Sequence, residues 1–321
     1  MSSLLAITND GAAEVGAFFY ALAVVGTVAA VTTSFVSISL HLKHYRRPDL
    51  QRLVIRIMFM VPLYAVTSLA SLTSRYLAEY VDLFRDVYEA FVVYTFFILM
   101  INYLGGEREL LTMLQDRMTT HHLWPLHYFL SPIDLSDPKV FLIVRRGVLQ
   151  FVVLKPILAV FILIMKLMGF YHEGLIRFDS AYVYVSLFYN VSVCVAMYCL
   201  VIFYLQCSKD LEAYRPLPKF ICVKAIIFFS FWQGFIVAVL VGFDIIHDKG
   251  DYPAQAIAVA IQDGLICIES VIFAIGHAYA YPWTDYGTSH RLASRVVVIY
   301  ALKDVLGTRD IIQDIIQTFS G

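Results

Sequence analysis

Seven separate stretches of this sequence are apolar over about the length that an α-helix needs to cross a lipid bilayer, which takes about 20 residues. They cover residues 15–40, 53–73, 87–104, 147–168, 181–205, 220–243 and 255–281. Lipid offers the backbone no hydrogen-bond partner, so each stretch has to pair its own N–H and C=O groups, as an α-helix does. The sequence therefore predicts an all-α integral membrane protein, a bundle of seven transmembrane helices.

The composition excludes an ordinary soluble domain. Of the 321 residues, 60% are hydrophobic and 15% are charged, whereas soluble domains have about 45–50% and about 25%. The formal net charge is −1, which gives no basis for a nucleic-acid partner. Membrane lipids are the surroundings and the first partners that we expect.

The distribution of basic residues predicts the direction of the spans, because cytoplasmic connections retain Lys and Arg during insertion. One set of alternate connections holds sixteen of the 24 basic residues, and the other holds only Arg75, Arg85, Arg177 and Lys249. We therefore expect an N-out, C-in topology. Residues 1–14 are then a short non-cytoplasmic N-terminus, 15–283 the transmembrane domain and 284–321 a cytoplasmic tail.

Polar residues inside the spans are the candidates for function, since such groups are costly in lipid and usually face the bundle interior. Six of them form the predicted substrate pathway or pocket: Glu89, Lys155, Asn190, Gln233, Asp263 and Glu269. Asp263 and Glu269 are six residues apart, so they lie about 120° from each other around one helix. The other interpretation is that these groups form hydrogen bonds between helices, each of which stabilises the bundle by roughly 0.6 kcal/mol.

Two prolines and two basic residues in the spans have simpler interpretations. Pro62 and Pro156 each remove a backbone donor, so we expect helix kinks there. Arg56 and Lys224 lie near the cytoplasmic ends of their spans, and we expect their side chains to snorkel to the headgroups.

Two segments on the cytoplasmic side could bind lipid or a partner. Lys43, Arg46, Arg47 and Arg52 follow the first span at the depth of anionic lipid headgroups, although basic residues there also fit ordinary positive-inside flanking. In the tail, Ala301–Phe319 has apolar residues at helical spacing and predicts one amphipathic helix. Its polar face is not basic, so we expect it to dock on the bundle or on a cytoplasmic protein.

Signatures of enzymes are absent from the sequence. His121, His122 and His127 have no neighbouring cysteine, and no H-E-x-x-H, G-x-S-x-G, P-loop or G-x-G-x-x-G occurs. The sequence thus predicts no enzyme, no metal site and no cofactor.

The run from His41 to Tyr64, H-x-x-H-Y-x-x-P-x-x-Q-R-x-x-x-R-I-x-x-M-V-P-x-Y, resembles a family signature. Further matches follow in order at Arg85–Phe91, Gly105–Glu107, Gln150 with Lys155–Pro156, Pro218–Phe220, Phe231–Gln233 and Cys267–Glu269. Together they resemble the organic solute transporter alpha-subunit family, a group of DUF300-type proteins. The pattern is most similar to its transmembrane protein 184 branch, with plant Lazarus-type and fungal vacuolar members. The resemblance implies seven spans and a vacuolar or endolysosomal membrane in preference to the plasma membrane.

The leading hypothesis is a carrier of organic solutes or amphipathic, lipid-like molecules in an endomembrane. A scaffold that recruits trafficking or autophagy proteins through its cytoplasmic loop and tail is the alternative, and self-association into a homo-oligomer fits either hypothesis. A G-protein-coupled receptor is disfavoured, because the third span ends in Gly105-Gly106-Glu107 and the last span lacks N-P-x-x-Y.

Overall fold

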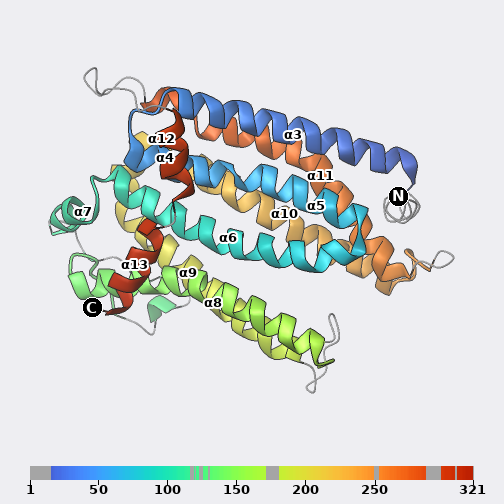
Figure 1. The fold of residues 1–321 in the computed structure, drawn as a ribbon. Coiled ribbons are helices and arrows are strands. Elements are labelled where there is room, and N and C mark those ends of the chain that lie inside the picture. Colours follow the sequence, from blue (N-terminus) through green and yellow to red (C-terminus); the bar gives the residue numbers. More distant parts are fainter. Residues whose placement is uncertain are drawn as a thin grey trace. The chain divides into compact units, whose positions relative to one another are not determined.

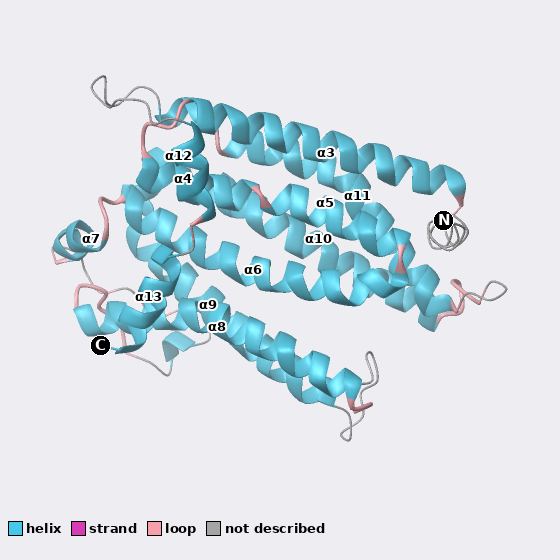
Figure 2. Ribbon diagram, in the orientation of Figure 1, coloured by secondary structure: helices cyan, strands magenta, loops and turns pink. Residues whose placement is uncertain are grey.

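The computed structural model describes the chain except residues 1–15, 116–118, 120, 123–125, 129–130, 171–180, 249–252, 287–297, 308 and 321. Every regular element in the described ranges is a helix (Figures 1 and 2). The α-helices are α3 (Ala17–Lys43), α4 (Pro48–Met58), α5 (Met60–Thr73), α6 (Arg75–Tyr103), α7 (Glu107–Leu114), α8 (Pro138–Leu167), α9 (Ala181–Leu211), α10 (Pro216–Gly242), α11 (Ala254–Ala280), α12 (Val298–Leu306) and α13 (Arg309–Ser320). Short 3-10 turns η1 (Leu126–Tyr128), η2 (Glu212–Tyr214) and η3 (Trp283–Tyr286) lie between them.

Six helical segments in the described part are long and apolar enough to cross a membrane: Ala17–Lys43, Pro48–Thr73, Pro138–Met165, Tyr184–Tyr214, Pro216–Gly242 and Ala254–Tyr286. A seventh meets the same test only as a pair, Leu83–Tyr103 with Glu107–Leu114, which is bent by 66°. The all-helical, multi-pass membrane architecture predicted from the sequence is therefore confirmed with six to seven candidate spans, while their direction stays a prediction.

The chain divides into two compact units. The first unit contains residues 1–88 and 217–305, and thus α3, α4, α5, the start of α6, α10, α11 and nearly all of α12. The second unit contains residues 89–216 and 306–321, and thus the rest of α6, α7, α8, α9 and α13. The tail therefore contributes one helix to each unit.

Small side chains let α3, α5 and α11 pack closely in the first unit, where these three helices run side by side (Figure 1). Ala23 and Ala30 are fully buried, and a Cβ added to Gly26 would lie 2.9 Å from the carbonyl oxygen of Cys267. Such close approach of backbones replaces the hydrophobic effect as the driving force between helices in lipid. The spacing of small residues along α3 thus determines which face meets α11.

The second unit is built on the pairing of α8 with α9 (Figure 1). Gln150 and Ser192 exchange two hydrogen bonds: the Gln150 amide donates to the Ser192 carbonyl, and the Ser192 hydroxyl donates to Gln150 Oε1, both at 2.8 Å. A Cβ on Gly147 would lie 2.4 Å from Cys199 Sγ, so a larger residue there would force the sulfur to move. The two helices are held by polar pairing and by a small residue at their contact.

Two of the long helices begin well before the apolar stretch that predicted them. α8 begins at Pro138, where the Asp137 carboxylate accepts a 2.9 Å hydrogen bond from the Lys139 amide. An acidic N-cap followed by proline is a strong helix start. Hydropathy reports the part of a helix that lies in hydrocarbon, so the polar ends extend beyond the predicted bounds.

The two predicted kink sites differ in the structure. The second candidate span is interrupted at Phe59, between α4 and α5, three positions before Pro62. Proline at 62 leaves the Met58 carbonyl without its usual partner. α8, in contrast, continues through Pro156 as one helix.

The tail forms two helices, whereas the sequence predicted one. α12 ends at Leu306, α13 begins at Arg309, and Gly307 lies between them. Glycine is about 1 kcal/mol less favourable than alanine inside a helix, and the apolar spacing alone did not take this into account.

Candidate functional site

The six predicted pocket residues divide evenly between the units. Asp263, Glu269 and Gln233 lie in the first unit, and the remaining three, Glu89, Lys155 and Asn190, lie in the second.

Asp263 is the most deeply held acidic group of the first unit. Its residue is 5% exposed, and it projects from α11 toward α5 and α6. The Ser71 hydroxyl donates a 2.5 Å hydrogen bond to Oδ2 of Asp263, and Nη1 of Arg85 lies 3.8 Å from Oδ1. The carboxylate is thus bound by one neutral donor and one cation from two different helices.

Arg85 corrects the sequence interpretation. The basic-residue count placed it in a connection outside the membrane, ahead of a span beginning at residue 87. In the structure it lies within α6, its side chain is 18% exposed, and its guanidinium carbon is 5.4 Å from the Tyr64 ring centroid. Nη1 also donates to Ser68 Oγ at 3.4 Å. A basic residue at the end of a span can turn inward when a buried carboxylate is within reach, and hydropathy does not register this.

Glu269 and Gln233 form a second polar pair, between α11 and α10. The Gln233 side chain interacts with the Glu269 carboxylate. One oxygen of each, Oε2 of Glu269 and Oε1 of Gln233, is buried without a hydrogen-bond partner among the described residues. Both atoms are acceptors, so a hydrogen-bond donor is what this pair lacks.

In the second unit, Lys155 is enclosed by aromatic rings. The residue is 5% exposed, and Nζ lies 3.8 Å from the Tyr189 ring centroid and 5.9 Å from that of Phe151. An ammonium over a ring face is attracted by about 2 kcal/mol when it is desolvated. The two rings thus contribute to the stability of a buried cation in this unit.

The other two candidates of the second unit have different surroundings. Glu89 is 7% exposed and belongs to the buried part of α6. Asn190 lies on an exposed face of α9, and its amide donates a 2.7 Å hydrogen bond to the Ser186 carbonyl of its own helix. Such a bond satisfies the donor without a second helix, so Asn190 does not join a polar cluster in the described contacts.

The signature run from His41 onward forms a hydrogen-bonded junction between α3 and α4. Gln51 is fully buried, and its Oε1 accepts hydrogen bonds from the backbone amides of Arg46 and Arg47 at 2.7 and 2.9 Å. Its Nε2 donates to the His44 carbonyl at 3.0 Å, and Nε2 of His41 bonds the Tyr281 carbonyl at 2.9 Å. The signature thus determines the path of the α3–α4 connection and its attachment to the end of α11.

The same junction holds α12. The Tyr45 hydroxyl donates to Asp304 at 2.6 Å, and Nε of Arg56 donates to the Val305 carbonyl at 2.9 Å. Burial and then the hydrogen bond to Asp304 raise the pKa of Tyr45 above its ordinary value, so its hydroxyl remains a donor. Arg56 is only 5% exposed, so the expected snorkelling is wrong: the tail carbonyl provides the acceptor that a headgroup was expected to provide.

The four predicted headgroup residues therefore lie in different environments. Arg52 lies 3.8 Å from Asp304 of the tail, and Arg47 lies 3.8 Å from Asp49. Arg46 contributes its backbone amide to Gln51. Lys43 ends α3 on an exposed face.

α13 is attached within the second unit by basic residues of α8. Asp314 accepts hydrogen bonds from Arg145 and from Tyr94 of α6, and Nε of Arg146 donates to the Thr318 carbonyl at 2.8 Å. Arg145 also contacts Glu107 of α7 at 2.7 Å. Asp314, one residue of the polar face predicted for the tail, thus pairs with Arg145 of α8.

The described residues contain no group of three or more His, Cys, Asp or Glu side chains arranged to hold a metal ion. Of the three loop histidines, His122 stacks on and hydrogen-bonds Tyr198 of α9.

Sequence reasoning missed Arg85, Ser71 and Gln51 as organising residues. Thr67, Ser68 and Ser71 repeat at helical spacing and are all buried, a signal for a polar face on α5. Nothing in the sequence alone pairs this face with Asp263.

Comparisons with known proteins show which family and which relatives the sequence of this chain is similar to. A sequence model of the family described as organic solute transporter Ostalpha matches residues 19–286. The chain is 38% identical over 294 residues to the protein named vacuole membrane protein hfl11 of Schizosaccharomyces pombe, covering 91% of this chain and 68% of that protein. It is 40% identical over 308 residues to vacuole membrane protein HFL1 of Saccharomyces cerevisiae, covering 93% and 70%. A transmembrane protein 184 homologue of Dictyostelium discoideum is 34% identical over 275 residues, covering 84% and 54%. No solved structure matches the chain.

Proposed function

We propose that this chain, which belongs to the organic solute transporter Ostalpha family, carries an amphipathic organic solute or lipid-like molecule across an endomembrane. The membership confirms the resemblance predicted from the signature. Two of its relatives are named vacuole membrane proteins, which supports a vacuolar membrane as the location. The uneven distribution of basic residues supports the N-out, C-in orientation.

The observation that carries this proposal is the pair of unpartnered acceptors, Glu269 Oε2 and Gln233 Oε1. A buried polar atom without a partner costs about 1–3 kcal/mol. A ligand whose polar end carries N–H or O–H donors recovers that cost, and its apolar part lies against the apolar side chains of α10 and α11. Six residues along α11, the Asp263 carboxylate is already satisfied by Ser71 and Arg85, so it has a structural role in the same unit.

Two solutes with matched tails test the requirement for donors. Lysophosphatidylethanolamine has an ammonium with N–H groups, whereas lysophosphatidylcholine has a quaternary nitrogen with none. Uptake of each radiolabelled solute is measured in liposomes containing the purified protein. We expect faster uptake of the ethanolamine form and loss of this preference in Glu269→Gln.

The matched control is Glu109→Gln, the same substitution at an exposed position of α7. Equal uptake of both solutes by the unaltered protein, or equal effects of the two substitutions, contradicts the carrier site at Glu269.

The second candidate function is a membrane scaffold that binds a cytoplasmic trafficking or autophagy protein through its tail. The observation that favours it is the attachment of α12 and α13 by hydrogen bonds and ion pairs, with Ile316 left 59% exposed. Deleting residues 298–321 separates the two functions. If the variant still takes up solute in liposomes but no longer replaces the intact protein in cells, the scaffold function is supported. If uptake is lost, the tail is required for the carrier function.

A further inference from the structure

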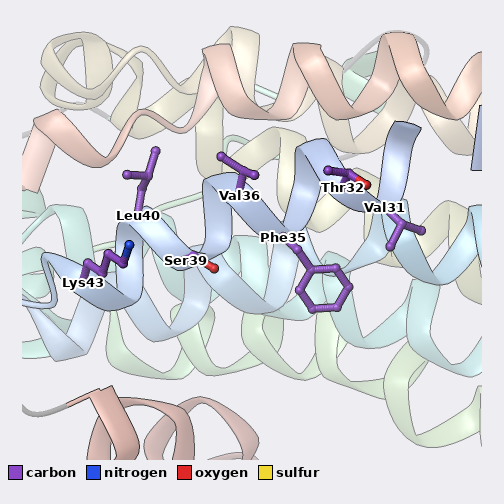
Figure 3. Close-up of a pocket in the computed structure, with 7 residues that line it drawn as sticks. All are labelled: Val31, Thr32, Phe35, Val36, Ser39, Leu40 and Lys43. Carbon is purple, nitrogen blue, oxygen red and sulfur yellow. The ribbon is translucent and has the colours of Figure 1, made fainter. Parts of the chain in front are cut away.

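An outward-facing hollow lies along the last three turns of α3, away from the polar pairs. It has a volume of about 530 Å³, and all of its lining residues lie between positions 31 and 43 of this one helix (Figure 3). Phe35 and Val36 are 48% and 57% exposed there. The ring of Phe35 meets Phe59, at the α4–α5 break, edge to face with 6.4 Å between centroids.

The hollow changes character along its length. Val31, Phe35, Val36 and Leu40 line it with apolar groups, and Lys43 closes one end. Figure 3 shows the Lys43 side chain turned back along the helix on the side of Ser39. The Thr32 hydroxyl donates to the Val28 carbonyl at 2.7 Å, so it adds no free donor to the lining. The exposed face between Phe35 and Val36 thus leads past Ser39 to one cation.

The dimensions match one leaflet of a bilayer. Positions 31 to 43 span about 18 Å along a helix, and half of the hydrocarbon core is about 15 Å thick. α3 has 27 residues and is about 40 Å long, so its end at Lys43 reaches the headgroup region while the apolar lining stays in hydrocarbon.

Lys43 differs from its basic neighbours in its electrostatic partners. Arg47 and Arg52 each lie 3.8 Å from a carboxylate of the protein, Asp49 and Asp304 respectively. Lys43 forms no such ion pair within the part of the chain that the structure describes. Its charge is available to a phosphate outside the protein.

We propose that the α3 hollow binds one bilayer phospholipid with an anionic headgroup, one acyl chain lying on the exposed face between Phe35 and Val36 and the phosphate beside Lys43. Charge complementarity and the match in length favour this occupant over a peptide, which would leave backbone groups unpaired in hydrocarbon. The site is separate from the carrier site and does not depend on it.

Native mass spectrometry of the delipidated protein in detergent tests this assignment. Phosphatidylinositol and phosphatidylcholine with identical acyl chains are titrated separately, and the fraction of protein with one bound lipid is measured. We expect phosphatidylinositol to bind at least five-fold more tightly. Lys43→Ala is expected to reduce that preference about five-fold, the effect of about 1 kcal/mol per basic residue near a membrane surface.

Two further variants distinguish a specific site from general lipid coating. Val36→Trp fills the exposed hollow without entering the packed face and should weaken binding of both lipids. Lys139→Ala removes an exposed lysine at the start of α8 and should leave the preference unchanged. Equal affinities for the two lipids, or equal effects of Lys43→Ala and Lys139→Ala, would overturn the proposal.

Discussion

Removing the charge of Arg85 should destabilise the first unit mainly through Asp263. The substitution Arg85→Leu removes the cation 3.8 Å from a carboxylate whose side chain is only 6% exposed, and it leaves the hydrogen bond from the Ser71 hydroxyl in place. Breaking a buried pair by removing one partner costs about 3–5 kcal/mol. The Arg85 side chain is still 18% exposed to solvent. We therefore expect a loss near the lower end of this range, about 3 kcal/mol of unfolding free energy.

A double-mutant cycle isolates the pair itself. At 3.8 Å and an effective dielectric constant of about 20, Coulomb's law gives roughly 4 kcal/mol. Partial exposure screens part of this energy, so we expect a coupling free energy of about 2 kcal/mol. If Asp263→Asn alone costs about 2 kcal/mol, the double variant Arg85→Leu/Asp263→Asn should lose about 3 kcal/mol instead of about 5.

Unfolding free energies of the four proteins are measured by SDS titration in mixed micelles, followed by tryptophan fluorescence. The chain contains a matched control: Arg47 and Asp49 are also 3.8 Å apart, but their side chains are 34% and 54% exposed. Their cycle should give a coupling below about 0.5 kcal/mol. If the buried and the exposed pairs give the same coupling, the reasoning about burial is refuted.

Three further experiments test single contacts. Gln51→Leu removes the side chain that holds the α3–α4 connection and should lower the unfolding free energy by about 2–4 kcal/mol; an unchanged SDS midpoint would contradict this. Lys155→Met combined with Tyr189→Leu should show a coupling of about 1–2 kcal/mol in a double-mutant cycle, and additive losses would remove the cation–π contact from the account. Gly26→Leu should separate α3 from α11, because its Cβ would lie 2.9 Å from the Cys267 carbonyl oxygen; a loss of more than about 3 kcal/mol is expected, and a fully stable variant would mean that the helices are not in contact there.

The positions of the long helices were predictable, whereas the polar contacts were not. In lipid, a run of about 20 apolar residues satisfies its backbone hydrogen bonds as a helix. Each apolar stretch in the sequence therefore lies in a long helix, except 53–73, which is divided between α4 and α5. Helix ends such as Arg75 and Pro138 lie in polar sequence. Capping residues determine where such helices begin, and hydropathy does not predict these positions.

Whether a polar side chain pairs across helices depends on tertiary geometry. Asn190 and Asp263 look alike in the sequence, as polar groups in apolar runs. In the structure, Asn190 bonds its own helix, while Asp263 is buried between Ser71 and Arg85. Spacing along one helix gives the face of a residue, but it does not give the partner on that face. The same limit applies to Arg56, whose acceptor lies in α12, far along the chain.

A density map of the protein in lipid nanodiscs with lysophosphatidylethanolamine is the most direct test of the carrier site. We predict an elongated density whose polar end lies within hydrogen-bond distance, about 3 Å, of both Glu269 Oε2 and Gln233 Oε1. A map in which those two oxygens are satisfied by the protein itself, with α10 and α11 closed around them and no ligand beside them, would contradict the account.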